Sequence, residues 1–226
     1  MSFWMQRLQS FQIPFATTER FGEKYLHFED PHGLQLEIVE RAERAQNTWQ
    51  ADEITPEVAI KGFGGATLLS SRPEQTAVLL EHVMGLDKIG QEGDIIRFRS
   101  TGEIGNMIDL KQTTVERGRL GVGAVHHIAW RASDDSDQLE WKLHVEEHGY
   151  MATPVQDRNY FNSIYFRERG DILFEIATDP PGFAHDESFE TMGEQLMLPA
   201  RYEPYRAQLE QTLVPIRVRA LNKRPL

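Results

Sequence analysis

One histidine and one glutamate lie on two segments that have the pattern of buried β-strands. His127 lies within residues 125–130, and Glu175 follows 48 residues later within residues 173–177. Because side chains alternate between the two faces of a strand, each of these two would share a face with apolar neighbours. A buried carboxylate needs an ion pair or a metal. The pattern therefore indicates two ligands of the two-histidine, one-carboxylate arrangement that holds Fe(II) and leaves positions open for substrate and oxygen.

Plainer interpretations of the same residues remain open from the sequence. Adjacent histidines such as His126 and His127 can be one exposed residue and one residue that is hydrogen-bonded in the core. Glu175 could instead pair with Arg158 or Arg167 in a structural ion network. An internal repeat, described next, favours the metal site over both alternatives.

The chain repeats itself. Residues 25–38 align without a gap on residues 163–176, so that Glu37 matches Glu175, and residues 96–110 form a weaker copy in which Asp109 takes the same position. A strand and a helix precede the second and third of these hairpins, so each unit is predicted to be β-α-β-β-β. Glu37 and Asp109 lack a strand histidine and look vestigial.

The predicted helices have apolar faces. Residues 71–85 start at a Ser-Arg-Pro-Glu sequence and should bury Ala77, Leu80 and Met84, and residues 135–148 should bury Leu139, Trp141 and Leu143. We expect an α+β fold of repeated β-α-β-β-β units that form open, barrel-like mixed sheets. The expected division is residues 1–41 as an incomplete second unit of an N-terminal module, 42–56 as a linker, 57–115 as the third unit, 116–183 as the fourth unit with the metal ligands, and 184–226 as a C-terminal tail with a short helix.

The composition excludes several classes of function. The 226 residues include 24 Lys and Arg against 35 Asp and Glu, and the net charge of −11 argues against binding nucleic acid or an anionic membrane. The chain has no cysteine, so any metal must be held by His, Asp or Glu, and the composition fits a reducing cytoplasm. No apolar run approaches the ~20 residues that span a bilayer, and the N-terminus lacks the layout of a signal peptide.

The chain resembles the vicinal oxygen chelate superfamily, which includes glyoxalase I, bleomycin-resistance proteins and extradiol dioxygenases. It is most similar to the hydroquinone-type ring-cleaving dioxygenases. The resemblance covers essentially the whole chain and is carried by residues 62–69, 123–127, 157–161, 164–168 and 174–183. It implies an Fe(II)-dependent enzyme that opens a hydroquinone or catechol ring with dioxygen.

The resemblance also implies roles for individual residues. His127 and Glu175 would be metal ligands, while His126, Arg158 and Tyr165 would orient the substrate hydroxyl, take up its proton and stabilise the oxygenated intermediate. In that family the other iron-binding histidine lies on the first strand of the first unit. The present chain is expected to begin after that unit, as a truncated form whose third ligand comes from elsewhere.

Two other functional classes remain as alternatives to the dioxygenase. One is a glyoxalase-like, metal-dependent isomerase or lyase, which would not consume oxygen. The other is a non-catalytic binding fragment. In every case we expect the chain to bind a small molecule, which for the dioxygenase is an aromatic diol. We expect it to bind neither nucleic acid nor a membrane. The incomplete first unit would leave sheet edges and an apolar face uncovered, which favours a homo-oligomer.

Overall fold

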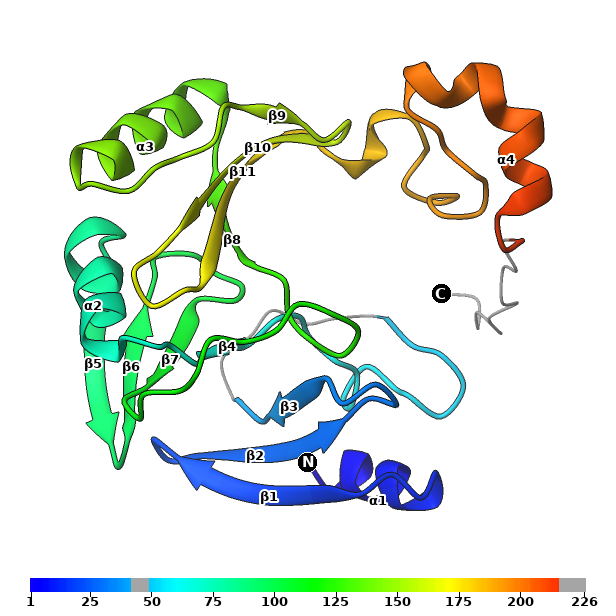
Figure 1. The fold of residues 1–226 in the computed structure, drawn as a ribbon. Helices are drawn as coiled ribbons and strands as arrows, with labels where there is room; N and C mark the ends of the chain where they lie inside the picture. The colour runs from blue at the N-terminus through cyan, green and yellow to red at the C-terminus, as the bar shows by residue number, and fades with distance from the viewer. Residues whose placement is uncertain (42–48, 216–226) are drawn as a thin grey trace. The chain divides into compact units, whose positions relative to one another are not determined.

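A computed structural model describes residues 1–41 and 49–215, so residues 42–48 of the predicted linker lie outside the described part of the chain. The described residues form three sheets and several helices (Figure 1). The first sheet has the order β1-β2-β3 and follows helix α1. Its elements are α1 Ser2–Ser10, β1 Phe15–Arg20, β2 Glu23–Glu29 and β3 Gln35–Val39.

The second sheet belongs to a complete β-α-β-β-β unit. Strand β4 pairs in parallel with β7, while β5, β6 and β7 pair antiparallel, in the order β4-β7-β6-β5. The helix is an α-helix that continues as one π-helical turn and ends at Gly85, whose φ is +72°. The elements are β4 Gly65–Leu68, α2 Pro73–Val78, η1 Leu79–Val83, β5 Asp87–Glu92, β6 Ile95–Arg99 and β7 Met107–Lys111.

The third sheet repeats this unit with the order β8-β11-β10-β9. Its elements are β8 Ile128–Ala132, α3 Asp135–Glu147, β9 Gln156–Asp157, β10 Phe161–Arg167 and β11 Leu173–Pro181, and they are followed by η2 Phe183–His185, η3 Ala200–Tyr205 and α4 Arg206–Thr212. The predicted α+β fold with repeated β-α-β-β-β units and mixed sheets is therefore confirmed.

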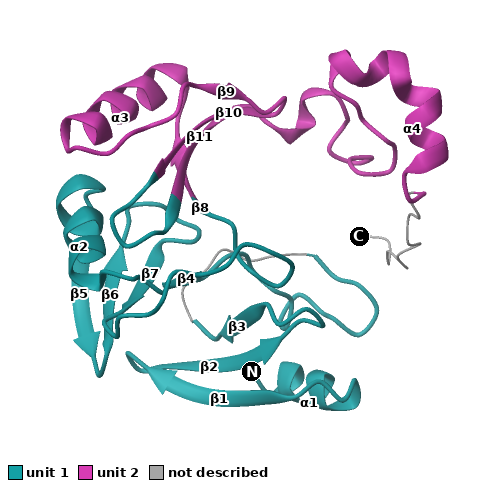
Figure 2. Ribbon diagram, viewed as in Figure 1, with its two compact units in different colours: residues 1–128, 167–173, 223–226 teal, residues 129–166, 174–222 magenta. Residues whose placement is uncertain are grey.

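The chain divides into two compact units (Figure 2). Unit 1 contains residues 1–128 and 167–173, and unit 2 contains residues 129–166 and 174–215 within the described range. The core of unit 1 includes Leu26, Leu79, Leu80, Phe98 and Leu110, whereas that of unit 2 includes Val145, Ile164, Phe166, Phe174 and Ile176. Leu80 and Met84 are buried as the helix pattern predicted.

The predicted buried face of α3 was wrong. Leu139 and Leu143 are 50% and 61% exposed, and the helix buries Gln138 and Val145 instead. The Gln138 side-chain amide donates to main-chain carbonyls of β10 and β11 at 2.8 and 2.7 Å. These two hydrogen bonds satisfy a buried polar side chain, so the helix can turn this face to the sheet although it carries fewer apolar residues.

The turn between β10 and β11 docks on the start of α2 through a buried carboxylate. Glu168 accepts hydrogen bonds from Thr76 Oγ1 at 2.9 Å and from the backbone N–H groups of Gly170 and Ile172 at 2.8 and 2.9 Å. Ser70 Oγ lies 2.7 Å from Thr76 Oγ1, and both hydroxyl side chains are fully buried. All these residues belong to unit 1. Several directed donors therefore stabilise a charge that burial alone would disfavour.

Gly170→Ala should lower the free energy of unfolding by about 1–3 kcal/mol, because an added methyl group overpacks this contact. A Cβ atom at Gly170 would overlap Ser70 Oγ and lie 2.5 Å from Thr76 Oγ1. Gly118→Ala is the matched control, since a Cβ there meets no atom within 4 Å. Urea unfolding of both variants tests this expectation, and equal midpoints for Gly170→Ala and the wild type would contradict it.

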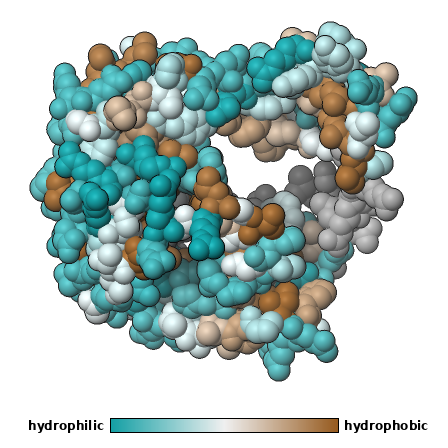
Figure 3. All heavy atoms as spheres, viewed as in Figure 1, coloured by the Kyte–Doolittle hydropathy of each residue, from teal (hydrophilic) through white to brown (hydrophobic). Residues whose placement is uncertain are grey.

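The surface mixes charged and apolar side chains. Figure 3 shows hydrophobic residues exposed among hydrophilic ones on the face in view. Large apolar side chains that are exposed include Phe63, Val122, Val125 and Met151. Across residues 1–41 and 49–215, no helix has both the length and the apolar character needed to cross a membrane.

Candidate functional site

Glu175 lies on β11 and is only 3% exposed. Two hydroxyl groups from the neighbouring strand β10 donate to the same carboxylate oxygen, Oε1. They are the Tyr165 hydroxyl, at 2.8 Å, and Ser163 Oγ. Because Ser163 and Tyr165 are two residues apart on a strand, their side chains lie on one face. The hydroxyl pair therefore fixes the orientation of a buried carboxylate.

Arg158 extends this series of polar groups. Its Nε donates to the Tyr165 hydroxyl oxygen at 3.3 Å, and its guanidinium carbon lies 5.2 Å from the centre of the Tyr165 ring, which is within cation–π range. Arg167, the other arginine considered as a partner of Glu175, donates instead to the main-chain oxygen of Asp171 at 2.6 Å. Within unit 2, Arg158 therefore contacts the Tyr165 hydroxyl group, and that hydroxyl group contacts the Glu175 carboxylate.

His126 and His127 lie at the end of unit 1. The prediction that a strand begins at Val125 was wrong, because β8 begins at Ile128 and Val125 is 73% exposed. A strand extends only as far as a neighbour offers backbone partners. The two Nδ1 atoms of the histidines lie 2.9 Å apart, so one must carry the proton when the other accepts it.

An ion pair shows which face of β11 carries Glu175. Arg131 on β8 donates to both carboxylate oxygens of Asp179 on β11, at 2.9 and 2.7 Å, across a sequence separation of 48 residues. Since alternate residues of a strand share a face, Glu175 lies on the same face of β11 as Asp179. His127 and Glu175 have the same sequence separation of 48 residues.

The described residues contain no group of three or more His, Asp or Glu side chains arranged to hold a metal ion. The sequence-predicted ligands are divided between the two units, with His127 in unit 1 and Glu175 in unit 2. An imidazole and a carboxylate are nevertheless ligand types that suit Fe(II). The hydroxyl donors on Glu175 provide the kind of supporting contact that orients a metal-binding carboxylate.

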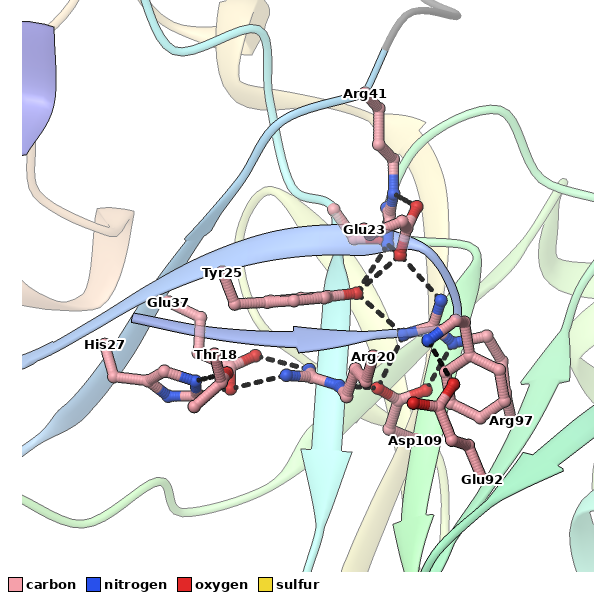
Figure 4. Close-up of polar contacts among 12 residues, drawn as sticks. Thr18, Arg20, Glu23, Tyr25, His27, Glu37, Arg41, Glu92, Arg97 and Asp109 are labelled. Carbon is pink, nitrogen blue, oxygen red and sulfur yellow. Dashed lines mark hydrogen bonds and ion pairs between the residues drawn. The ribbon is translucent and has the colours of Figure 1, made fainter. Parts of the chain in front are cut away.

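Asp109, which matches Glu175 in the repeat, has a different environment (Figure 4). Arg97 binds it through two parallel hydrogen bonds of 2.7 and 2.8 Å, and Arg20 adds a third at 2.7 Å. The side chains of Arg97 and Asp109 are both 4% exposed. Asp109 is therefore part of a buried ion network, and the expectation that it is vestigial does not describe its structural role.

Glu37, the third member of the repeat position, is also paired with arginine. Arg20 donates to its two carboxylate oxygens at 3.1 and 2.7 Å, and His27 Nδ1 lies 3.0 Å from Oε1. His27 takes the position of Tyr165 in the repeat. Arginine thus neutralises the equivalents of Glu175 in unit 1, whereas within unit 2 neutral hydroxyl groups donate to Glu175 itself.

Glu23 completes the arginine network of unit 1. Burial raises the pKa of its carboxyl group, but hydrogen bonds from Arg41, Tyr25 and Arg97 outweigh burial and lower the pKa to about 2. A lowered pKa means that the folded state favours the ionised form. Its contribution to stability is present above the ordinary pKa of about 4.5 and is lost as the pH falls toward 2.

Glu23→Gln should therefore flatten the acid limb of the stability curve between about pH 4.5 and 2, because the amide does not titrate. Urea unfolding at steps of pH measures the difference from the wild type. Glu140→Gln, at an exposed position of α3, is the control and should leave the slope unchanged. If the free energy of unfolding of Glu23→Gln falls with pH as steeply as that of the wild type, the Glu23 carboxylate does not cause the loss of stability in acid.

Sequence patterns did not identify Ser163 or the arginines of the network as parts of these clusters. Ser163 could have been found from strand alternation, since it is two residues from Tyr165 and therefore shares its face. Arg20 could not, because it is 89 residues from Asp109 and only the packing of two sheets in unit 1 brings them together.

Comparison with known proteins gives a consistent set of relatives. No protein-family model matches the chain. MhqO of Bacillus subtilis (strain 168), named as a candidate ring-cleaving dioxygenase, is 64% identical over 222 residues, which cover 98% of this chain and 71% of MhqO. The chlorohydroquinone/hydroquinone 1,2-dioxygenase of Sphingobium indicum is 33% identical over 221 residues, which cover 94% of this chain and 68% of that enzyme.

A solved structure agrees with these relatives. The crystal structure of a candidate dioxygenase from Bacillus subtilis subsp. subtilis strain 168 superimposes with a TM-score of 0.93 at 65% sequence identity. The match covers 97% of this chain and 71% of the crystallised one. The similarity thus extends over both units of the present chain.

Proposed function

Because the chain belongs to the family of ring-cleaving dioxygenases that these relatives define, we propose that it opens the ring of a small aromatic diol, hydroquinone or catechol, with dioxygen and Fe(II). The observation that carries the proposal is the buried Glu175 carboxylate with hydroxyl groups and Arg158 arranged beside it. A relative named as a chlorohydroquinone/hydroquinone 1,2-dioxygenase supports the substrate class.

His127 and Glu175 are the proposed metal ligands. An imidazole nitrogen and a carboxylate oxygen are ligand types that fit Fe(II). When bound, the metal would supply Lewis acidity toward the diol oxygen and the redox chemistry that dioxygen requires.

The remaining residues act on charge and protons. The Tyr165 hydroxyl holds the Glu175 carboxylate in one orientation and offers its own oxygen to Arg158. Arg158 brings a permanent positive charge to this place, which favours a deprotonated substrate oxygen. His126, whose Nδ1 lies 2.9 Å from that of His127, is the proposed acceptor of the diol proton.

Oxygen uptake tests the proposal directly. The chain is loaded anaerobically with Fe(II) and supplied with methylhydroquinone and then catechol in an oxygen electrode. We expect uptake by the wild type and by His82→Ala, whose histidine is exposed on η1, and no uptake by His127→Ala. Absence of uptake by the wild type, or normal uptake by His127→Ala, would refute the proposal. Substrate loss without oxygen loss would instead indicate a glyoxalase-like isomerase or lyase.

Three further expectations are kept as proposals. The division at residues 41, 56, 115 and 183 follows the repeat, with residues 116–183 as the unit that carries the site. The lack of cysteine favours the cytoplasm. Exposed apolar side chains such as Phe63 and Val122 favour a homo-oligomer, which sedimentation would detect.

A further inference from the structure

We propose that the segment directly after β11, residues 182–186, positions Arg158 by holding the turn on which it lies. The inference rests on the proposed function, because it assumes that Arg158 assists the reaction. Phe183 and Asp186 are then positioning residues, which act on the reaction through Arg158. Both lie in unit 2 together with the turn that they contact.

The turn needs support from outside itself. Arg158 is its first residue, and the backbone N–H of Arg158 donates to the Phe161 carbonyl at 2.9 Å. Asn159 has a φ of +71°, a conformation that asparagine tolerates, and its N–H donates to Asp157 Oδ1 at 2.7 Å. The strand on one side, β9, is only two residues long. Such a short pairing at a sheet edge opens easily.

Residues 182–186 supply that support through three kinds of contact. The Gly182 N–H donates to the Tyr160 carbonyl at 2.9 Å, and Gly182 has a φ of +83°, which favours glycine. The Tyr160 hydroxyl donates to Asp186 Oδ2 at 2.9 Å, a hydrogen bond that raises the pKa of Tyr160. The Phe183 ring lies 5.4 Å from the ring of Tyr160 and 6.3 Å from that of Phe161.

The contact between Arg158 and Tyr165 is sensitive to the position of the turn. At 3.3 Å, the distance from Arg158 Nε to the Tyr165 hydroxyl is already at the long end for a hydrogen bond. A displacement of about 1 Å would break it, and misplacement of that size can reduce a rate by about 100-fold. Phe183 is 61% exposed, so its removal should loosen the turn without opening the core.

A double-mutant cycle tests the proposal. Phe183→Ala should lower kcat/KM for methylhydroquinone by about 10- to 100-fold in the wild-type background. In the Arg158→Ala background the same change should have no further effect. Phe183→Tyr should keep the wild-type activity because it keeps the aromatic ring. Phe189→Ala, which removes another exposed phenylalanine of this tail, should also leave activity unchanged. An equal loss in both backgrounds, or no loss in either, would overturn the proposal.

A second measurement does not depend on the reaction. The ¹⁵N NMR signal of the Arg158 Nε–H group should shift and exchange faster with water in Phe183→Ala and in Asp186→Asn, and stay unchanged in Phe189→Ala. If the chain shows no oxygen uptake but this signal responds as expected, the proposed function fails while the contact between the tail and Arg158 stands. An unchanged Arg158 signal in Phe183→Ala would overturn the positioning role.

Discussion

Replacement of Asp109 by alanine is expected to lower the free energy of unfolding by about 3–5 kcal/mol, because it removes one of the two carboxylates that neutralise the buried Arg97 guanidinium. Arg97 donates two hydrogen bonds to Asp109 and is itself only 3% exposed, and Arg20 donates another. Hydrogen bonds to Asp109 raise the pKa of Arg97 against the opposing effect of its burial. Without Asp109 the guanidinium group still keeps its proton, because arginine stays charged in proteins, so the buried charge remains.

Urea unfolding of Asp109→Ala measures this loss. Asp94→Ala is the matched control, because Asp94 is exposed and lies 4.0 Å from Lys111 in a surface pair of small expected effect, about 0–1 kcal/mol. If Asp109→Ala and Asp94→Ala lose the same small amount, the network of unit 1 does not behave as a buried one. Arg20 and Arg97 would then have to be hydrated in the folded protein.

The second large effect is expected on activity. Glu175→Gln should reduce oxygen uptake by more than about 100-fold, since even the loss of a supporting contact to a metal ligand costs about 10- to 100-fold. The amide has the shape of the carboxylate and can still accept from Ser163 and Tyr165, so the fold should be kept. What it lacks is the negative charge that a divalent metal requires.

Glu37→Gln is the control for this variant, because Glu37 holds the equivalent place in the first hairpin. It should lose the ion pair with Arg20 and retain oxygen uptake. The amount of iron bound to each variant under anaerobic conditions gives a second reading, which should fall only for Glu175→Gln. Full activity and full iron content in Glu175→Gln would exclude Glu175 as a ligand.

The sequence was most informative where one pattern repeats. The gapless match of residues 25–38 with residues 163–176 predicted two hairpins, and the structure has both, as β2 with β3 and β10 with β11. The resemblance to the ring-cleaving dioxygenases brought Tyr165 into the candidate site, and the structure places its hydroxyl against Glu175. Local pattern and fold agree here because a hairpin is set by nearby residues.

Predictions that depended on tertiary contacts were weaker. Leu139 and Leu143 fit a helical apolar face, but the polar Gln138 found carbonyl partners on the sheet and faces inward instead. The strand before Ile128 was extended too far because a strand's end depends on its neighbour. Arg20 is 89 residues from Asp109 in the sequence, so no local pattern predicts that contact.

The boundary between the two units has a consequence for any attempt to take the protein apart. Besides dividing the chain after Ile128, it passes through a hairpin, because β10 and β11 lie mainly in unit 2 while residues 167–173 belong to unit 1. A gene divided after residue 128 would yield a first piece in which Thr76 had lost the Glu168 carboxylate. The second piece would display that charged loop to solvent. A cut after residue 128 therefore does not give two pieces that each keep the contacts of one unit.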